Sequence, residues 1–252
     1  MNVPDIIGGS PGTTGIFLDF DGTLSEIVAR PELAVAVDGA AETLSALADT
    51  YALVAVVSGR PSEEVRARLG VPGVAVFGLY GLEHLGGRAA VPENDREALL
   101  ADVMRCMDDV PGARLEDKGS SLAVHVRGVT DPDEAMRRLE RTLRTVARTH
   151  GMVVLPGKMV LELAPAATPG KGAVVLREAR SRGLTAVLYA GDDVADLDAF
   201  AAVDRLWGEG PEGVKVAVGG PESPDALLAA ADLVVDGPAG LIALLRDLRP
   251  TG

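Results

Sequence analysis

The sequence predicts an α/β protein in which a Rossmann-like parallel sheet is interrupted by an inserted α+β unit. In the first third of the chain, and again after Gly170, apolar runs of strand length alternate with helix-like segments. This alternation indicates a parallel sheet with helices on both faces. Between these parts, two helices alternate with two pairs of short strands, which is typical of a small antiparallel sheet. We therefore expect a core of residues 1–89 and 165–252 and an insertion of residues 90–164.

The first part of the core begins with a buried strand over 16–20, because the apolar run there is nearly continuous. The elements expected after it are a helix over 38–50 with Asp38 as its N-cap, a strand ending at Val57, a helix opened by Pro61 and closed by Gly70, and a short strand over 73–81. The residues before the first strand are expected to be a flexible leader without a signal peptide, because a basic segment and a long apolar run are both missing.

The insertion and the rest of the core follow the same rules. In the insertion we expect helices near 93–108 and 131–149, two strands within 113–128, and two strands within 151–165 on either side of Pro156-Gly157. After Gly170 we expect helices over 171–182 and 194–203, strands over 185–190, 214–218 and 232–235, and a last helix to about residue 247.

Composition excludes several classes of partner. The net charge is −13, which argues against nucleic acid and anionic membranes because neither is attracted over long range. No apolar run approaches the roughly 20 residues that span a bilayer. Cys106 is the only cysteine, which excludes an internal disulfide and favours a cytoplasmic setting. The oligomeric state stays open, with a monomer as the expectation.

Chemically active residues follow three of the expected core strands. Ligands of open parallel sheets bind beyond the carboxyl ends of the strands. The first strand delivers Asp19 and Asp21, which share a face because side chains alternate along a strand. The residues delivered to the same edge by other segments are Ser58, Gly59 and Arg60 before a helix start, Lys171 in PGKG, and Asp192, Asp193 and Asp196 in GDDVAD. A hydroxyl beside a helix N-terminus is suited to a phosphate group.

This set of residues points to magnesium and phosphoryl transfer. Several converging carboxylates need a cation, and oxygen ligands are those that Mg²⁺ prefers. A site to which no His or Cys is delivered is a poor zinc site. One aspartate can attack phosphorus to form an aspartyl-phosphate, and the other can protonate the leaving alkoxide and then activate water. Lys171 and the metal would neutralise the charge between the anionic nucleophile and the phosphate.

The motifs DFDGT, SGR, GKG and GDDVAD resemble, in this order, those of the haloacid dehalogenase phosphatase superfamily. The resemblance implies that Asp19 is the nucleophile and Asp21 the acid/base, with Ser58 and Lys171 as further catalytic residues. We expect Mg²⁺ to bind the Asp19 carboxylate, the Asp21 backbone carbonyl and Asp192, with Asp193 and Asp196 outside the ligand shell. The Asp21 side chain would then be free to exchange protons.

The insertion is similar to the cap domain of the trehalose-6-phosphate phosphatases, through LEDKGSSLAVHVR and GKMVLELAP. The resemblance implies Mg²⁺-dependent hydrolysis of trehalose 6-phosphate, in trehalose biosynthesis. The residues that it implies for sugar binding in the cap are Glu116, Lys118, His125, Arg127, Lys158 and Glu162, beside Gly59 and Arg60 of the core. The chain departs from the family pattern at Tyr80, where His is common, and at Ala195 and Leu197, where Thr and Glu are frequent.

Three alternatives remain at this point. The substrate could be a related sugar phosphate, such as a glucosyl- or mannosyl-phosphoglycerate or sucrose phosphate. A sugar phosphomutase would share DFDGT but would need a second basic cluster for a bisphosphate. A silent sugar-phosphate sensor is disfavoured because every catalytic position is filled. His84 and His150 are expected to be structural.

Overall fold

The computed structural model describes residues 3–28, 30–85 and 93–248. The chain divides into two compact units, one formed by Met1–His84 and Pro169–Gly252 and the other by Leu85–Thr168. The inserted unit is therefore longer at both ends than residues 90–164. The predicted fold class is confirmed, because one unit contains a parallel sheet and the other an antiparallel sheet.

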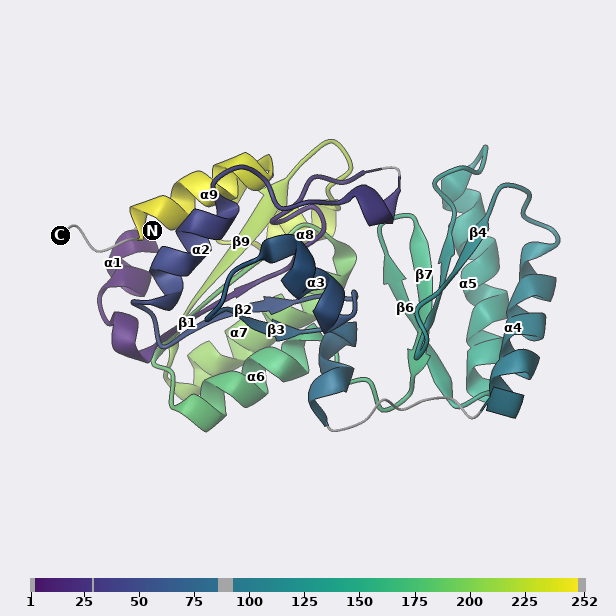
Figure 1. The fold of residues 1–252 in the computed structure, drawn as a ribbon, viewed down its shortest axis with the longest axis horizontal. Helices are drawn as coiled ribbons and strands as arrows, with labels where there is room; N and C mark the ends of the chain where they lie inside the picture. Colours follow the sequence, from purple (N-terminus) through teal and green to yellow (C-terminus); the bar gives the residue numbers. More distant parts are fainter. Residues whose placement is uncertain (1–2, 29, 86–92, 249–252) are drawn as a thin grey trace. The chain divides into compact units, whose positions relative to one another are not determined.

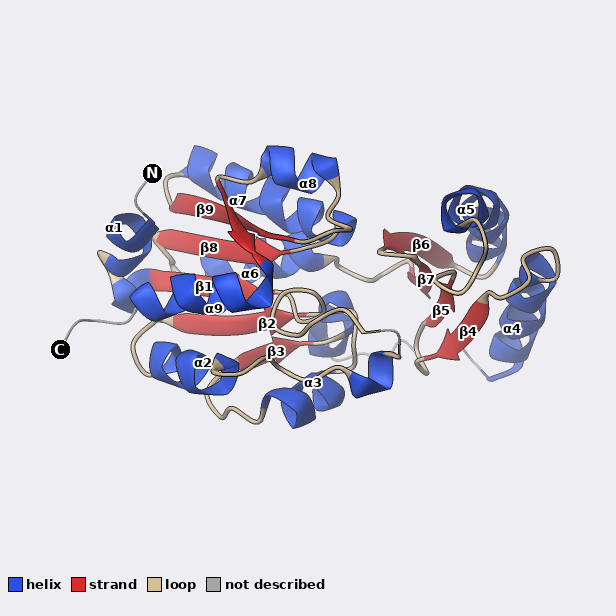
Figure 2. Cartoon of the chain, turned by 90° about the horizontal axis from the view of Figure 1, so that it is seen from above, coloured by secondary structure: helices blue, strands red, loops and turns tan. Residues whose placement is uncertain are grey.

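The core unit contains a six-stranded sheet in the order β10-β9-β8-β1-β2-β3, with all neighbouring strands parallel (Figures 1 and 2). Its strands are β1 (Thr14–Leu18), β2 (Leu53–Val57), β3 (Ala75–Phe77), β8 (Ala186–Gly191), β9 (Glu212–Gly219) and β10 (Leu233–Asp236). The chain adds β2 and β3 on one side of β1 and β8 to β10 on the other. The strand order therefore reverses between β1 and β8, and this is where ligands of such sheets bind.

Helices cover both faces of the core sheet, as Figure 2 shows. One apolar cluster joins Ile16 and Leu18 to α1 (Val3–Gly8), α2 (Ala40–Ala48), α3 (Ser62–Leu69) and α9 (Gly237–Asp247). The other joins Phe17 and Tyr189 to α6 (Lys171–Arg182), α7 (Leu197–Glu209) and α8 (Asp225–Ala230). Because β1 is buried on both faces, an apolar run with little alternation is the sequence that it requires.

The inserted unit pairs a four-stranded antiparallel sheet, in the order β4-β5-β7-β6, with two helices. Its elements are α4 (Glu93–Met107), β4 (Arg114–Asp117), β5 (Leu122–His125), α5 (Pro132–Thr149), β6 (Met152–Gly157) and β7 (Val160–Pro165). Leu122 and Val124 face an apolar cluster that includes Leu139 and Leu143 of α5. The opposite sheet face carries the alternate residues of these strands.

Several element boundaries differ from those expected. The N-cap of α2 is Gly39, with φ of 79°, and not Asp38. The strand expected over 73–81 ends at Phe77, because Leu79 and Tyr80 adopt left-handed conformations. The expected flexible leader contains α1, whose Ile7 is fully buried. The short helix α8 has no counterpart among the sequence expectations.

The turn between β6 and β7 also lies elsewhere than expected. Pro156 and Gly157 belong to β6 and pair with Leu161 and Val160, so the turn is Lys158-Met159. Proline cannot donate a backbone hydrogen bond and is tolerated at the edge of a sheet. The strand β6 is such an edge, which explains why Pro156 does not end it.

No helix among the described residues is long and apolar enough to cross a membrane.

Candidate active site

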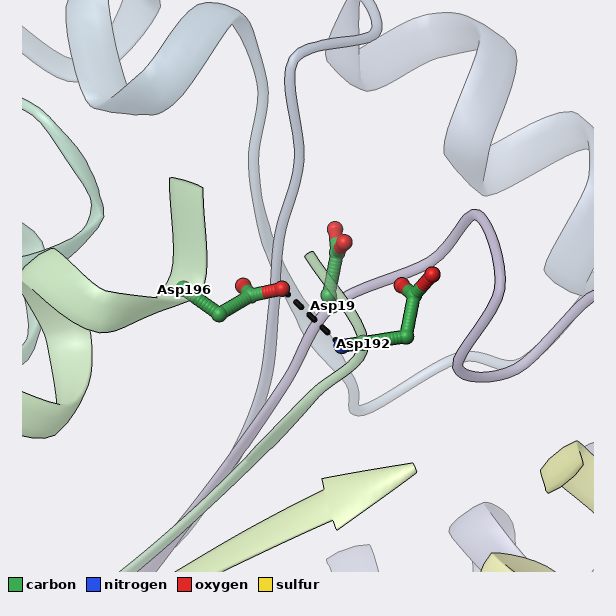
Figure 3. A group of neighbouring side chains, drawn as sticks. All are labelled: Asp19, Asp192 and Asp196. Atoms are coloured by element: carbon green, nitrogen blue, oxygen red, sulfur yellow. Dashed lines mark hydrogen bonds between the residues drawn. The ribbon is translucent and has the colours of Figure 1, made fainter. Parts of the chain in front are cut away.

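Asp19 and Asp192 meet where the strand order of the core sheet reverses. Asp19 directly follows β1, and its backbone N–H donates to the carbonyl oxygen of Ala190 in β8 at 2.9 Å. Asp192 directly follows β8, so both carboxylates reach the same edge of the sheet. Together with Asp196 they form a buried acidic group whose ligand atoms all lie within 4.8 Å of one another. Figure 3 shows the carboxylates of Asp19 and Asp192 turned in a common direction.

The carboxylate of Asp196 is turned toward the protein. One of its oxygens accepts from Lys171 Nζ and the Tyr189 hydroxyl, both at 2.7 Å. The other accepts from the backbone N–H groups of Asp192 and Asp193, both at 3.0 Å; Figure 3 draws the first of these bonds. A carboxylate offers about four lone-pair positions, and four donors use them. The four donors thus use the lone-pair positions of Asp196, and its place outside the ligand shell stays a prediction.

Asp193 begins the short helix that contains Asp196. Its side chain accepts from the backbone N–H of Val194 at 2.7 Å and forms a capping box with Asp196. The cap holds both acids of this segment in fixed positions.

Gly22 and Thr23 of the DFDGT motif hold Asp192 in place. Gly22 has φ of 79°, and a methyl group on it would lie 2.1 Å from a carboxylate oxygen of Asp192. The Thr23 hydroxyl donates to the other carboxylate oxygen of Asp192 at 3.3 Å. Only glycine satisfies both the left-handed backbone and the close approach of the carboxylate.

Lys171 is the buried cation of the group. Its Nζ lies 2.9 Å from Asp19 and 2.7 Å from Asp196, and its side chain is 3% exposed. Burial by itself would lower the pKa of Lys171, but the charges of Asp19 and Asp196 prevail and raise it. Lys171 is therefore a permanent cation suited to charge neutralisation and not to proton transfer.

The start of α6 places Lys171. The backbone N–H of Gly172 donates to the Asp198 carboxylate at 2.8 Å, and a methyl group on Gly172 would lie 2.3 Å from the Asp198 carbonyl oxygen. The first turn of α6 is thus pressed against the first turn of α7.

Burial raises the pKa of Asp19 well above its usual value. Lys171 opposes this shift, whereas the neighbouring Asp196 and Asp192 add to it. Among these four side chains, three carboxylates face one ammonium. A divalent cation would offset the excess negative charge, and the oxygen donors suit a hard ion such as Mg²⁺. The residues present therefore fit a metal held by Asp19 and Asp192.

The side chain of Asp21 is hydrogen-bonded to Arg60, a contact that the sequence analysis did not predict. Nε and a terminal nitrogen of Arg60 each donate to one Asp21 oxygen at 2.7 Å. Such a two-point bond is among the stronger polar contacts in proteins. The Arg60 side chain is largely buried, while that of Asp21 is 37% exposed. Each Asp21 oxygen accepts one of these bonds, so each keeps a second lone-pair position.

Ser58 and Gly59 lie between β2 and α3. Ser58 is buried, and its hydroxyl accepts from the backbone N–H of Arg60 at 3.1 Å. The loop ends at Pro61, the N-cap of α3. A hydroxyl and a helix start therefore adjoin, as the SGR motif predicted.

In the inserted unit, the predicted sugar-binding residues of the strands share the polar face of the sheet. Glu116, Ala123 and Glu162 lie opposite one another on β4, β5 and β7. His125 Nε2 lies 2.7 Å from Glu116. Lys118 donates to Glu162 at 2.9 Å, and this glutamate is only 3% exposed.

The other two predicted residues lie at one end of that sheet. Arg127 follows β5 and is exposed, and Lys158 is in the turn before β7. The two segments are adjacent, because the backbone N–H of Val126 donates to the carbonyl oxygen of Met159 at 2.9 Å.

Sequence reasoning missed four residues that hold the predicted ones in place. They are Thr23, Tyr189, Asp198 and Ser121, whose hydroxyl donates to Glu162 at 2.6 Å. Each acts through a partner distant in sequence or on another element, so a single sequence carries little signal for them. Thr23 and Asp198 lie within recognised motifs, DFDGT and the segment after GDDVAD, and could have been found there.

The fold of this chain, a parallel core with an inserted α+β unit, is of the haloacid dehalogenase type. A phosphatase of the haloalkanoate (HAD) enzyme superfamily from Bacteroides thetaiotaomicron has the same fold, with a TM-score of 0.63 at 18% identity over 95% of this chain and 96% of that one.

The chain belongs to the trehalose-phosphatase family, whose model matches residues 17–227. The trehalose-phosphate phosphatase of Mycobacterium avium is 34% identical over 252 residues, covering 93% of this chain and 62% of that protein. A protein of Mycobacterium tuberculosis named an uncharacterised glycosyl hydrolase is 39% identical over 213 residues, covering 77% of this chain but 16% of its own length. The chain thus spans less than two thirds of these relatives.

Among solved structures, the C-terminal domain of C. albicans trehalose-6-phosphate phosphatase has a TM-score of 0.80. The two chains are 22% identical, and the match covers 99% of this chain and 97% of that one. The likeness shows that both units of this chain have counterparts in one protein of the same fold.

Proposed function

We propose that this protein is a Mg²⁺-dependent phosphatase that hydrolyses trehalose 6-phosphate to trehalose and phosphate. The observation that carries the proposal is Asp19, a buried carboxylate beside Asp192 at the point where the strand order reverses, with Lys171 at 2.9 Å. Membership of the trehalose-phosphatase family supports the reaction, and the names of the mycobacterial relatives support the substrate.

The residues that would hold the metal are Asp19 and Asp192 through their carboxylates and Asp21 through its backbone carbonyl. Bound there, Mg²⁺ would supply positive charge that lowers the barrier to attack on an anionic phosphate. Asp193 and Asp196 would orient these ligands from outside the shell.

The protein's own residues divide the remaining work. The Asp19 carboxylate attacks phosphorus, forming an aspartyl-phosphate as the bond from phosphorus to the sugar oxygen breaks. Asp21 gives a proton to that oxygen and later takes one from the water that attacks the intermediate. Lys171 neutralises charge, while Ser58, Gly59 and Arg60 hold the phosphate at the start of α3.

We assign substrate specificity to the inserted unit. Its polar sheet face and adjoining turn offer charged donors and acceptors for sugar hydroxyls, namely Glu116, Lys118, His125, Arg127, Lys158 and Glu162. Charge-assisted hydrogen bonds suit this role because aromatic residues, which could stack on a sugar, are only 3% of the chain. The cytoplasmic setting and the monomeric state expected from sequence stay predictions.

Phosphate release from a panel of esters with Mg²⁺ tests the proposal. The panel contains trehalose 6-phosphate, sucrose 6-phosphate, glucosyl- and mannosyl-phosphoglycerate and glucose 6-phosphate. We expect the highest kcat/KM for trehalose 6-phosphate, and loss of turnover with EDTA and in a folded Asp19→Asn variant. Equal rates across the panel would contradict the substrate, and an isomerised product without phosphate would indicate a mutase.

A further inference from the structure

The segment after β3 adopts a backbone conformation that is unusual for its residues. Leu79, Tyr80 and Gly81 have φ of 49°, 55° and 86°, so three successive residues are left-handed. Two of them carry side chains, for which this conformation is costly. Such strain persists only where surrounding contacts enforce it, and it concentrates at functional sites.

The contacts that enforce it lead to the proposed phosphate-binding loop. The backbone N–H of Tyr80 donates to the carbonyl oxygen of Ser58 at 2.9 Å, and that of Leu79 to the carbonyl oxygen of Arg60 at 3.0 Å. The segment 79–81 therefore binds the backbone on either side of Gly59. The strained conformation and the conformation of the loop depend on each other.

The ring of Tyr80 completes this arrangement. A methyl group on Gly59 would lie 2.6 Å from the Tyr80 hydroxyl oxygen and 2.7 Å from the ring carbon that bears it. Gly59 does not have the left-handed φ that would itself call for glycine. A side chain at position 59 would thus displace the Tyr80 ring.

The other end of the segment contacts the helix that carries Lys171. A methyl group on Gly81 would lie 2.3 Å from a methyl carbon of Val174, in the first turn of α6. The segment 79–81 therefore contacts both the proposed phosphate-binding loop and α6.

We propose that Tyr80 is a positioning residue for phosphate binding, because its ring and its left-handed backbone hold Ser58, Gly59 and Arg60 in the conformation that receives the phosphate. This inference rests on the proposed function, which assigns that loop to the phosphate. It gives a role to a residue at which the chain departs from the family pattern. A preformed loop binds more tightly because ordering it costs nothing further on binding.

A double-mutant cycle on the full chain with Mg²⁺ tests the inference. The variants are Tyr80→Asn, which suits a left-handed backbone but removes the ring, Gly59→Ala, and the pair combined. The measurements are the inhibition constant of inorganic phosphate, the KM for trehalose 6-phosphate and the thermal midpoint. We expect Tyr80→Asn to weaken phosphate inhibition and raise KM by about tenfold each, with a small change in thermal midpoint.

Gly59→Ala would displace the same ring, so it should weaken phosphate inhibition in the wild-type background and have little further effect beside Tyr80→Asn. Wild-type phosphate affinity in Tyr80→Asn would overturn the inference. So would an equal effect of Gly59→Ala in both backgrounds. Where Tyr80→Asn does not fold, Tyr80→Gly replaces it in the cycle, because glycine also accepts a φ of 55°.

Calorimetric titration with inorganic phosphate separates this inference from the proposed function. If the wild type hydrolyses no ester but binds phosphate, the proposed function fails and the cycle still measures the effect of Tyr80 on binding. If the wild type hydrolyses sugar phosphates and the cycle shows no coupling, the inference fails and the function stands.

Discussion

Asp196 shows how one residue can resemble a metal ligand and act as a support. Its carboxylate lies within 4.8 Å of Asp19 and Asp192, yet its oxygens accept from four donors. A buried carboxylate is stable only when its lone pairs are used. Under the proposed function the site would therefore have two classes of acid, Asp19 and Asp192 as metal ligands and Asp196 as the residue that fixes their positions.

The Tyr189 hydroxyl is one of the donors that keep Asp196 in place, so Tyr189→Phe should disturb both stability and turnover. Leaving the buried carboxylate short of a donor should lower the free energy of unfolding by about 1–3 kcal/mol. A small displacement of Lys171 should reduce kcat about tenfold. Urea unfolding and phosphate release with Mg²⁺ measure the two effects.

Tyr51→Phe is the matched control for Tyr189→Phe. The Tyr51 hydroxyl also donates to one oxygen, the carbonyl of Leu248 at 2.7 Å, but at the far side of the core from the site residues. We expect a loss of stability without a loss of turnover. Equal kcat values for Tyr189→Phe and wild type would contradict the role given to Tyr189.

Asp19 gives the metal-free protein a characteristic dependence on pH. Because burial raises its pKa above the usual 3.8, the folded protein holds this proton more firmly than the unfolded chain. The stabilisation is complete below the usual pKa and is lost as pH rises through the raised pKa. In EDTA, the stability advantage of Asp19→Asn over wild type should therefore grow as the pH rises above the usual pKa of an aspartate.

Urea unfolding of the two proteins over a range of pH measures this effect. The contributions of the carboxyl groups that both proteins share cancel in the difference. At neutral pH, Mg²⁺ should make the wild type more stable than Asp19→Asn, since Mg²⁺ binds the ionised carboxylate that only the wild type has. A stability difference independent of pH would contradict the account of Asp19.

At the scale of an element, the turn after β1 decides whether the acids converge. Phe20 is buried and its carbonyl oxygen accepts from the backbone N–H groups of Thr23, Leu24 and Ser25. The tight turn that results brings Gly22 against the Asp192 carboxylate. The turn after β1, together with the pairing of β1 and β8, therefore places the DFDGT motif next to the GDDVAD motif.

Gly22→Ala should therefore lower the free energy of unfolding by more than an alanine substitution at a left-handed glycine with open space around it. The reference is Gly70→Ala, because Gly70 has φ of 65° at the end of α3 with open space where a methyl group would lie. We expect Gly70→Ala to destabilise by about 1 kcal/mol with normal turnover. Gly22→Ala should destabilise by about 2–4 kcal/mol and weaken Mg²⁺ activation, because the methyl group displaces Asp192. Unfolding and Mg²⁺ titration of turnover measure both, and equal behaviour of the two variants would contradict this view.

At the scale of the whole molecule, the two units have separate cores and separate sets of polar residues. The core sheet gathers acids around Lys171, whereas the inserted sheet pairs acids with Lys118 and His125. Under the proposed division, the first set acts on every phosphate ester and the second set recognises the disaccharide.

Glu162→Gln should separate these two sets. Glu162 accepts from Lys118 and Ser121, so the change weakens a buried ion pair on the polar sheet face. We expect kcat/KM for trehalose 6-phosphate to fall about 10- to 100-fold, a loss of the size that a misplaced contact causes. Hydrolysis of p-nitrophenyl phosphate should change little, because this ester has no disaccharide to recognise.

Glu134→Gln is the control within the same unit, since Glu134 forms an exposed pair with Arg137 on α5. It should behave as wild type with both esters. A parallel loss with both esters in Glu162→Gln would show that Glu162 supports the fold of the inserted unit and does not determine specificity.

The sequence by itself predicted the alternating core, the inserted unit and the acids of each motif. These features depend on local patterns: apolar runs, helix starts and the strand ends that carry Asp19 and Asp192. The misplaced boundaries lie where longer contacts prevail over local preference, as at Pro156, which an edge strand tolerates, and at Leu79 and Tyr80, which contacts with Ser58 and Arg60 hold left-handed.

Tertiary structure alone decided that Asp196 accepts from four donors, that Asp21 is held by Arg60, and that Tyr80 lies against Gly59. Asp21 and Arg60 are 39 positions apart, whereas the donors to Asp196 lie between 3 and 25 positions from it, so spacing in the sequence does not reveal these relations. They depend on the directions of individual hydrogen-bond donors and on atomic positions to within a few tenths of an ångström. Such positions become fixed only when the packed elements exclude other side-chain conformations.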